Sequence, residues 1–214
     1  MKLIYTASQV REAEKPYIEA DDYDGYLMQR AADAVAAEAQ ELLHGKDTAK
    51  ILLLIGPGNN GADTIYAGAR LSAKGHHVDA VIFDPSEKNL ELIAREGGEG
   101  TRVLDPEHTL EHLAGYDLTI DGILGTGSSG AVRGSAGEYL GVLRAAQLDG
   151  KLGAVLAVDT PSGVDNNRGT VHEPSLRADR TVTFIGHKLP AGTSHSVHSG
   201  DIKLYDLGVP EALD

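Results

Sequence analysis

The chain lacks cysteine, has no tryptophan and contains only 2 phenylalanines among its 214 residues. The absence of cysteine excludes disulfides, thiolate catalysis and zinc sites with cysteine ligands. No apolar run approaches the roughly 20 residues that span a bilayer. The sequence turns polar directly after Tyr5, so we expect no secretory signal and a cytoplasmic location. The length and the 41% hydrophobic content predict a single domain over residues 1–214.

The charge of the chain is strongly one-sided, with 19 basic against 32 acidic residues and a net charge of −13. Such a surface repels phosphate backbones and anionic lipids, so we expect neither nucleic acid nor membranes as partners. An anionic cofactor can still bind where backbone amides and a helix N-terminus supply local positive potential.

Two helices are predicted at the start of the chain. Thr6 and Gln9 have the spacing of a capping box, which predicts a helix through about Tyr17. A second helix is expected after Gly25, rich in alanine and with one apolar face. The apolar side chains that recur every seven residues along it are Met28, Val35 and Leu42. This face suits either the core of the domain or a dimer interface.

A βαβ unit follows. Residues 51–55 form a continuous apolar run, as expected of a strand that is buried on both faces. Residues 56–61 are a glycine-rich turn, residues 62–74 have a helical pattern, and residues 78–83 predict the next strand. Because a strand, a helix and a strand in this order form a parallel pair, the sheet is at least partly parallel.

Further strands are predicted at residues 118–124, 154–158, 181–185 and 201–205. No long helix separates the last two, so we expect them to form an antiparallel edge. The whole pattern predicts an α/β protein, a Rossmann-like three-layer α/β/α sandwich with a mostly parallel sheet.

Three loops follow predicted strands, and ligands of open α/β sheets bind at the carboxyl ends of strands. Residues 56–63 read Gly-Pro-Gly-Asn-Asn-Gly-Ala-Asp, residues 121–130 are rich in glycine, serine and threonine, and residues 159–165 begin with an aspartate. The glycines of the first loop allow the backbone to approach a ligand closely. It lacks the Gly-Lys-Ser/Thr of a P-loop, so it is either a nucleotide-binding turn or simply a tight βα turn.

The other two loops also allow two interpretations each. The second either wraps a phosphate with its amides and hydroxyls or is a mobile surface loop. In the third, Asp159 is a candidate general base or ribose ligand, or it caps its own turn. Oxygen ligands from Asn60, Asp121 and Ser162 have the chemistry to share a hard cation.

Two other positions have side chains that are suited to binding. His195 and His198 could bind zinc only with further ligands, and the surrounding serines and glycine favour a loop without metal. Lys188 follows the strand predicted at residues 181–185, where it either meets a phosphate or carboxylate or is a solvated surface lysine.

The three loops, in this order and spacing, resemble the YjeF N-terminal domain family, the NAD(P)H-hydrate epimerases. The family pattern is Gly-Pro-Gly-Asn-Asn-Gly-Gly-Asp, then Asp-x-x-x-Gly-Thr-Gly, then Asp-x-Pro-Ser-Gly. The opening helix, the segment at residues 27–32, the strand at 181–184 with Lys188, and the ending at 200–208 are also similar. The resemblance therefore covers nearly the whole chain.

The resemblance implies a Rossmann-like enzyme, commonly dimeric, that interconverts the R and S epimers of NADH and NADPH hydrated at C6 of the nicotinamide ring. It implies a potassium ion held by Asn60, Asp121 and Ser162. We expect Asp159 to be the acid/base of the reaction, with Asp63 as the second choice. The substrate-binding positions implied by the family are Asn59, Asn60, Gly61, Ala62, Asp63, Gly125, Thr126, Gly127, Ser128, Ser129, Gly130, Ala131 and Asp159.

The chain departs from the family pattern at Ala62 and Thr64, which replace glycines, and at Ala32, where the family often has glycine. A Cβ at residue 62 is costly if the position needs a positive φ. We interpret these replacements as tolerated variation.

The resemblance implies a homodimer. Many bacterial relatives continue into an NAD(P)H-hydrate dehydratase, so we expect the protein to be fused to, or to work with, such an enzyme. Two other hypotheses are a non-catalytic nucleotide-binding or protein-interaction scaffold and a different nucleotide-processing enzyme on the same fold.

Overall fold

The computed structural model describes residues 4–19, 25–97, 100–188 and 196–209. Within these residues the chain forms a seven-stranded sheet in which every neighbouring pair is parallel. In sheet order its strands are β11 (Asp201–Tyr205), β9 (Arg180–Phe184), β6 (Ala154–Val158), β5 (Leu118–Gly122), β2 (Lys50–Ile55), β3 (His77–Ile82) and β4 (Thr101–Val103).

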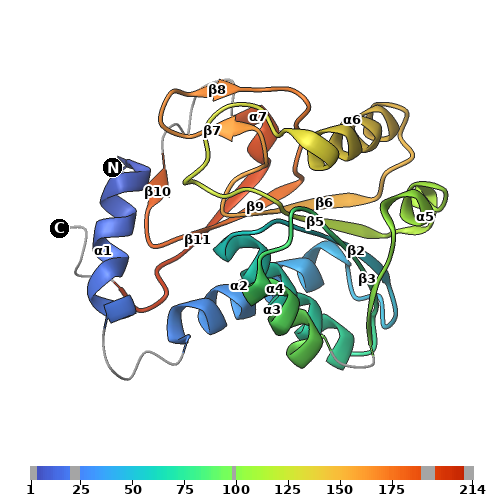
Figure 1. Cartoon of the computed structure of the whole chain (residues 1–214), viewed down its shortest axis with the longest axis horizontal. Helices are drawn as coiled ribbons and strands as arrows, with labels where there is room; N and C mark the ends of the chain where they lie inside the picture. Colours follow the sequence, from blue (N-terminus) through green and yellow to red (C-terminus); the bar gives the residue numbers. More distant parts are fainter. Residues whose placement is uncertain (1–3, 20–24, 98–99, 189–195, 210–214) are drawn as a thin grey trace.

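Helices cover both faces of this sheet (Figure 1). The described helices are α1 (Ala7–Glu19), α2 (Tyr26–Leu42), α3 (Asn59–Ala73), α4 (Glu87–Glu96), α5 (Pro106–Leu110), the 3-10 turn η1 (Leu113–Gly115), α6 (Gly134–Leu148) and α7 (Ser196–Ser199). Two small pairs complete the fold, the parallel β1 (Ile4–Tyr5) with β10 (His187–Lys188) and the antiparallel β7 (Val164–Asp165) with β8 (Thr170–Val171). The predicted three-layer α/β architecture is confirmed.

The alternation of side chains along β2 explains the three layers. Ile51, Leu53 and Ile55 pack into one core with α2 and α3, whereas Leu52 and Leu54 pack into a second core with α6. Because successive side chains of a strand point to opposite faces, a run that is apolar throughout has both faces covered. All five of these side chains are completely buried.

The first helices form where the sequence predicts them. The Thr6 hydroxyl accepts a hydrogen bond from the backbone N–H of Gln9 (3.2 Å), and the Gln9 side chain accepts one from the backbone N–H of Thr6 (2.9 Å). In α2, the buried residues Ala31, Ala34 and Val35 belong to the core that this helix shares with the sheet. The alanine face of α2 is therefore a core face.

Two expectations are wrong. β9 and β11 are parallel, not antiparallel; the stretch of chain between them, residues 185–200, is long enough for the connection of about a dozen or more residues that parallel neighbours need. Helix α3 begins at Asn59 rather than at residue 62, after Gly58 in an extended conformation. Asparagine and glycine are weak helix formers, but Asn60 bonds to two neighbouring strand ends, and these tertiary contacts outweigh the propensity.

None of the described helices is both long and apolar enough to cross a bilayer.

Gly56 and Gly58 allow a matched test of backbone packing at the end of β2. A Cβ on Gly56 would overlap the carbonyl of Ile123, whereas a Cβ on Gly58 would meet no atom within 4 Å. We expect Gly56→Ala to lower the free energy of unfolding by about 1–3 kcal/mol, the usual cost of overpacking. Gly58→Ala should change it by less than about 0.5 kcal/mol. Urea denaturation of both variants measures the difference, and equal stabilities would show that Gly56 is not tightly packed.

Candidate functional site

The three loops predicted from the sequence meet at one edge of the sheet. They follow β2, β5 and β6, which are adjacent strands. The chain continues from β2 toward β3 and β4, but from β5 toward β6 and β9, so the strand order reverses between β2 and β5. A crevice forms at such a switch point because the two connections leave in opposite directions.

A cleft of about 450 Å³ lies here. Its walls come from the three loops and from α1, α2 and the end of β9. Its lining residues are Val10, Arg11, Glu14, Leu27, Met28, Ala31, Pro57, Gly58, Asn59, Asn60, Asp63, Ile123, Leu124, Gly125, Thr126, Gly127, Ser128, Asp159, Phe184, Lys188 and Leu207.

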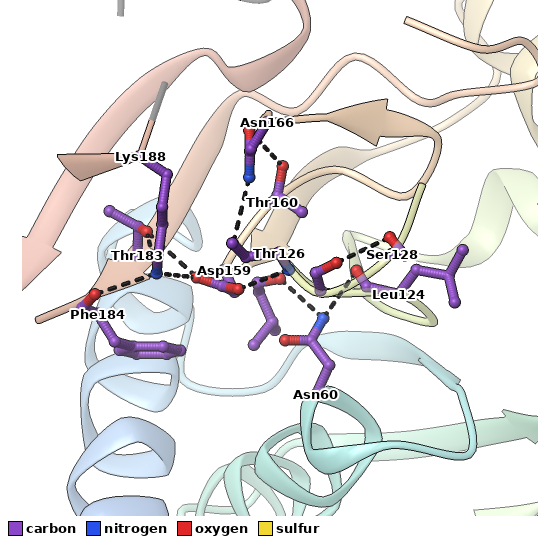
Figure 2. A network of polar contacts seen from close by, with 12 residues as sticks. Asn60, Leu124, Thr126, Ser128, Asp159, Thr160, Asn166, Thr183, Phe184 and Lys188 are labelled. Atoms are coloured by element: carbon purple, nitrogen blue, oxygen red, sulfur yellow. Dashed lines mark hydrogen bonds and ion pairs between the residues drawn. The ribbon is translucent and has the colours of Figure 1, made fainter. Parts of the chain in front are cut away.

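Asn60 joins the first loop to the other two (Figure 2). Its side-chain nitrogen donates to the carbonyl of Leu124 (3.1 Å) and to the carbonyl of Val158 (2.8 Å). The hydroxyl of Thr64, one turn later in α3, donates to the carbonyl of Asn60 (2.8 Å). The first turn of α3 is thereby fixed against the ends of β5 and β6.

Asp121 joins the second loop to the third. Its carboxylate accepts hydrogen bonds from the backbone N–H of Ser162 (2.8 Å) and from the Ser162 hydroxyl (2.6 Å). It is completely buried, and burial raises the pKa of Asp121 although the bonds from Ser162 and Ile123 act against the shift. No Lys or Arg of the described chain forms an ion pair with it. A buried carboxyl group without a positive partner is a place where a bound cation would stabilise the ionised form.

Asp159 stands directly after β6 and pairs with Lys188. Burial alone would raise the pKa of Asp159, but the ammonium of Lys188 and hydrogen bonds from Thr126 outweigh it and hold the pKa below its usual value. The side chains of Lys188 and Asp159 are only 5% and 14% exposed. Lys188 also donates to the Thr183 hydroxyl and to the Phe184 carbonyl, both at 3.0 Å (Figure 2). Asp159 is therefore an ionised carboxylate in a sheltered position.

The backbone conformation of Asp159 directs its carboxylate toward the second loop. Asp159 has φ 63, a left-handed conformation that is uncommon outside glycine, asparagine and aspartate. Its second oxygen accepts the backbone N–H of Thr126 (2.8 Å), and Asn166 donates to the Thr126 hydroxyl (3.2 Å). Asp159 thus does not cap its own turn but connects the third loop to the second.

Two further carboxyl groups share the cleft. Asp63 is 8% exposed, and within the described chain it has no hydrogen-bond or ion-pair partner. Burial raises the pKa of Asp63 well above its usual value, and the charges of Asp159 and Glu14 add to this. Burial likewise raises the pKa of Glu14. One cleft therefore places a carboxyl group with a lowered pKa beside two whose pKa values are raised, the arrangement from which acid and base roles are assigned.

The structure brings most of the predicted substrate positions to the cleft wall. Asn59, Asn60, Asp63 and Asp159 line it, as do the four residues 125–128. The others, which do not line it, are Gly61, Ala62, Ser129, Gly130 and Ala131.

Ala62 does not line the cleft, contrary to the substrate-binding role that the resemblance implied, but its replacement of the family glycine is tolerated by the fold. It lies inside α3, it is not among the residues with positive φ, and its side chain is completely buried in the core. The Cβ at this position therefore packs against the core and neither strains the backbone nor faces a ligand.

Of the remaining candidates, Lys188 meets a carboxylate rather than solvent. His195 lies outside the described residues, and His198 approaches Glu173. Sequence reasoning missed Val10, Arg11 and Glu14, which line the cleft from α1. Glu14 follows Val10 by four residues and Arg11 by three, spacings that make it a neighbour of both on the helix surface, but only the folded chain shows that this side of α1 faces the cleft.

Comparison with known proteins agrees with this geometry. A family model described as YjeF-related protein N-terminus matches residues 25–189. A protein of Microbacterium testaceum named NAD(P)H-hydrate epimerase is 34% identical over 213 residues, covering 98% of this chain and 80% of its own length. A solved yeast protein, ynu0, superposes with a TM-score of 0.74 at 20% identity, over 87% of this chain and 82% of its own, which shows the same fold.

Longer relatives also match. The bifunctional NAD(P)H-hydrate repair enzyme Nnr of Mycobacterium tuberculosis is 31% identical over 217 residues, which is 98% of this chain. The chain spans only 42% of the length of that relative.

The Lys188–Asp159 pair is testable by titration. Removing the ammonium in Lys188→Met leaves the burial of Asp159 unbalanced, so the pKa of Asp159 should rise from below to above its usual value. Carboxyl carbon NMR of labelled aspartate measures the shift. Lys15→Met, at an exposed position on α1, is the matched control and should leave the titration unchanged. An Asp159 that titrates alike in all three proteins would contradict the assignment.

Proposed function

The chain belongs to the YjeF-related protein N-terminus family, and on that basis we propose that it is an NAD(P)H-hydrate epimerase, an isomerase of nicotinamide cofactor repair. The observation that supports this best is the cleft itself, in which Asp159, Asp63 and the backbone of residues 125–128 lie together at a switch point. Such crevices bind dinucleotides in α/β folds. The close packing of its carboxyl groups favours an enzyme over a non-catalytic scaffold.

The reaction needs proton transfer but no change of oxidation state. In the hydrated cofactor, C6 of the ring carries a hydroxyl and is bonded to the ring nitrogen. The lone pair of that nitrogen forms a double bond to C6 as the C6–O bond breaks, and the departing hydroxyl takes a proton to leave as water. Water then adds to the other face of the planar iminium, the electron pair returns to nitrogen, and the added water loses a proton.

The cleft supplies groups for both proton transfers. Asp159, which Lys188 keeps ionised, stabilises the cationic iminium and accepts the proton of the incoming water. Asp63, whose pKa burial raises well above its usual value, protonates the departing hydroxyl. Reversal of the reaction exchanges these roles, so the two carboxyl groups share one proton. Positioned acid–base groups typically contribute a factor of about 10²–10⁴ to the rate.

A potassium ion fits the oxygen-rich junction beneath the cleft. Asn60, Asp121 and Ser162 offer an amide oxygen, a carboxylate and a hydroxyl, which are ligands that hard cations prefer. The buried charge of Asp121 has no cationic side chain to balance it among the described residues. When bound, the ion would neutralise this charge and hold the three loops in register.

The bifunctional relatives suggest the wider setting. An epimerase supplies the epimer that a stereospecific dehydratase consumes, so we propose that this domain works with, or is joined to, an NAD(P)H-hydrate dehydratase. A homodimer in the cytoplasm is a further prediction from the family resemblance.

Incubating the protein with one purified epimer of NADH hydrate tests the function. The other epimer should form much faster than in the same potassium buffer without protein, as followed by chromatography. Asp159→Asn and Asp63→Asn should each lower kcat by about 100-fold or more, because each removes a proton-transfer group.

The pH profile separates the two aspartates. Because Asp63 must be protonated to act as the acid, kcat of the wild type should fall as the pH rises through the raised pKa of Asp63.

Asp149→Asn is the control for the Asp159 and Asp63 variants. It changes an exposed aspartate at the end of α6 and should leave the rate unchanged. A rate no faster than buffer would refute the epimerase, and full activity of Asp63→Asn would remove that residue from the mechanism.

Potassium binding has a readout that is independent of activity. The melting temperature should rise more in potassium chloride than in choline chloride of equal ionic strength, because only potassium occupies the site. Asp121→Asn removes the buried charge and should abolish this difference. A wild-type protein that melts at the same temperature in both salts would argue against the ion.

A further inference from the structure

Helix α1 closes one side of the cleft although it lies outside the matched family region, which begins at residue 25. Val10, Arg11 and Glu14 of this helix line the cleft. The strand that precedes it, β1, pairs with β10, where Tyr5 is in register with Lys188. The N-terminal segment is therefore fixed beside the strand that carries the partner of Asp159.

Arg11 lies over the glycine loop that follows β5. One of its guanidinium nitrogens, Nη1, is 3.1 Å from the point that a Cβ on Gly127 would occupy. Gly127 is itself exposed at the cleft. The guanidinium and the flexible loop thus border the same volume, and a ligand between them would touch both.

The charges in the cleft leave Arg11 available for an anion. Among the described residues, the cations that line the cleft are Arg11 and Lys188. Lys188 is buried against Asp159 and two oxygen acceptors. Arg11 has no ion pair or hydrogen bond within the described chain. Burial raises the pKa of Glu14, one turn away, and the charge of Arg11 only partly opposes that rise.

An anionic ligand needs local positive charge in a protein with a net charge of −13. A guanidinium adds a full positive charge to the backbone amides of a loop and binds phosphate oxygens through two parallel N–H groups. We propose that Arg11 binds a phosphate of the dinucleotide substrate against the loop at residues 125–128, so that the N-terminal helix sets the affinity for the substrate. This inference rests on the proposed function, from which the dinucleotide is taken.

The substrate offers two kinds of phosphate for Arg11 to bind. One is the pyrophosphate that every dinucleotide carries, and the other is the 2′-phosphate that only the NADP form carries. Isothermal titration with ADP-ribose and with 2′-phospho-ADP-ribose distinguishes them, and neither probe requires catalysis. Arg11→Ala should weaken binding about tenfold, the lower end expected for a hydrogen bond to a charged group. An equal loss for both probes places Arg11 at the pyrophosphate, and a loss for the second probe alone places it at the 2′-phosphate.

Matched variants exclude a merely structural effect. Arg11→Lys keeps the charge but loses the paired geometry, so it should recover part of the affinity. Lys15→Ala removes an exposed cation from the same helix outside the cleft lining and should bind like the wild type. In the epimerase assay, Arg11→Ala should raise KM with kcat unchanged, because the contact exists in both the ground and transition states.

The outcomes separate this inference from the function on which it rests. Unchanged binding by Arg11→Ala, an equal loss in Lys15→Ala, or no binding of either probe by the wild type would overturn the role of Arg11. Arg11-dependent binding in a protein without epimerase activity would leave that role intact and overturn the proposed function alone.

Discussion

The reversal of strand order between β2 and β5 is the constraint on which the rest of the site depends. Because all strands of the main sheet are parallel, the loops after β2, β5 and β6 leave from one edge. Two buried contacts then lock these loops together, Asn60 to the strand-end carbonyls and Asp121 to Ser162. The positions of the cleft residues in these three loops follow from the topology and these two contacts.

The electrostatics of the cleft follow from how each carboxyl group is partnered. Asp159 is buried but has Lys188 beside it, so it stays charged. Asp63 is buried to a similar degree and has no hydrogen-bond or ion-pair partner among the described residues. Burial and the charges of Asp159 and Glu14 raise its pKa, against the opposing charge of Lys88. The pKa values of two aspartates in one cleft are therefore shifted in opposite directions, the pattern from which acid and base roles are assigned.

The sequence predicts the parts of this structure that depend on local patterns. The apolar run of β2, the capping box of α1 and the three glycine-rich loops are readable because periodicity and turn chemistry are local. The parallel β9–β11 pair and the start of α3 at Asn59 were not predictable, since a crossover and tertiary hydrogen bonds override local preference. Nor could the sequence show that Arg11 and Glu14 face the cleft, because the pairing of β1 with β10 places α1 there.

The proposed mechanism requires that the hydrated nicotinamide ring binds with C6 between Asp63 and Asp159. A crystal structure of the protein with an epimer of NADH hydrate, grown in potassium buffer, tests this claim most directly. In the expected complex, the hydroxyl on C6 lies within hydrogen-bonding distance of one of the two carboxyl groups, and a water near C6 lies within that distance of the other. The phosphates lie toward Arg11 and residues 125–128. A ring bound away from Asp159, or a substrate bound outside this cleft, would contradict it.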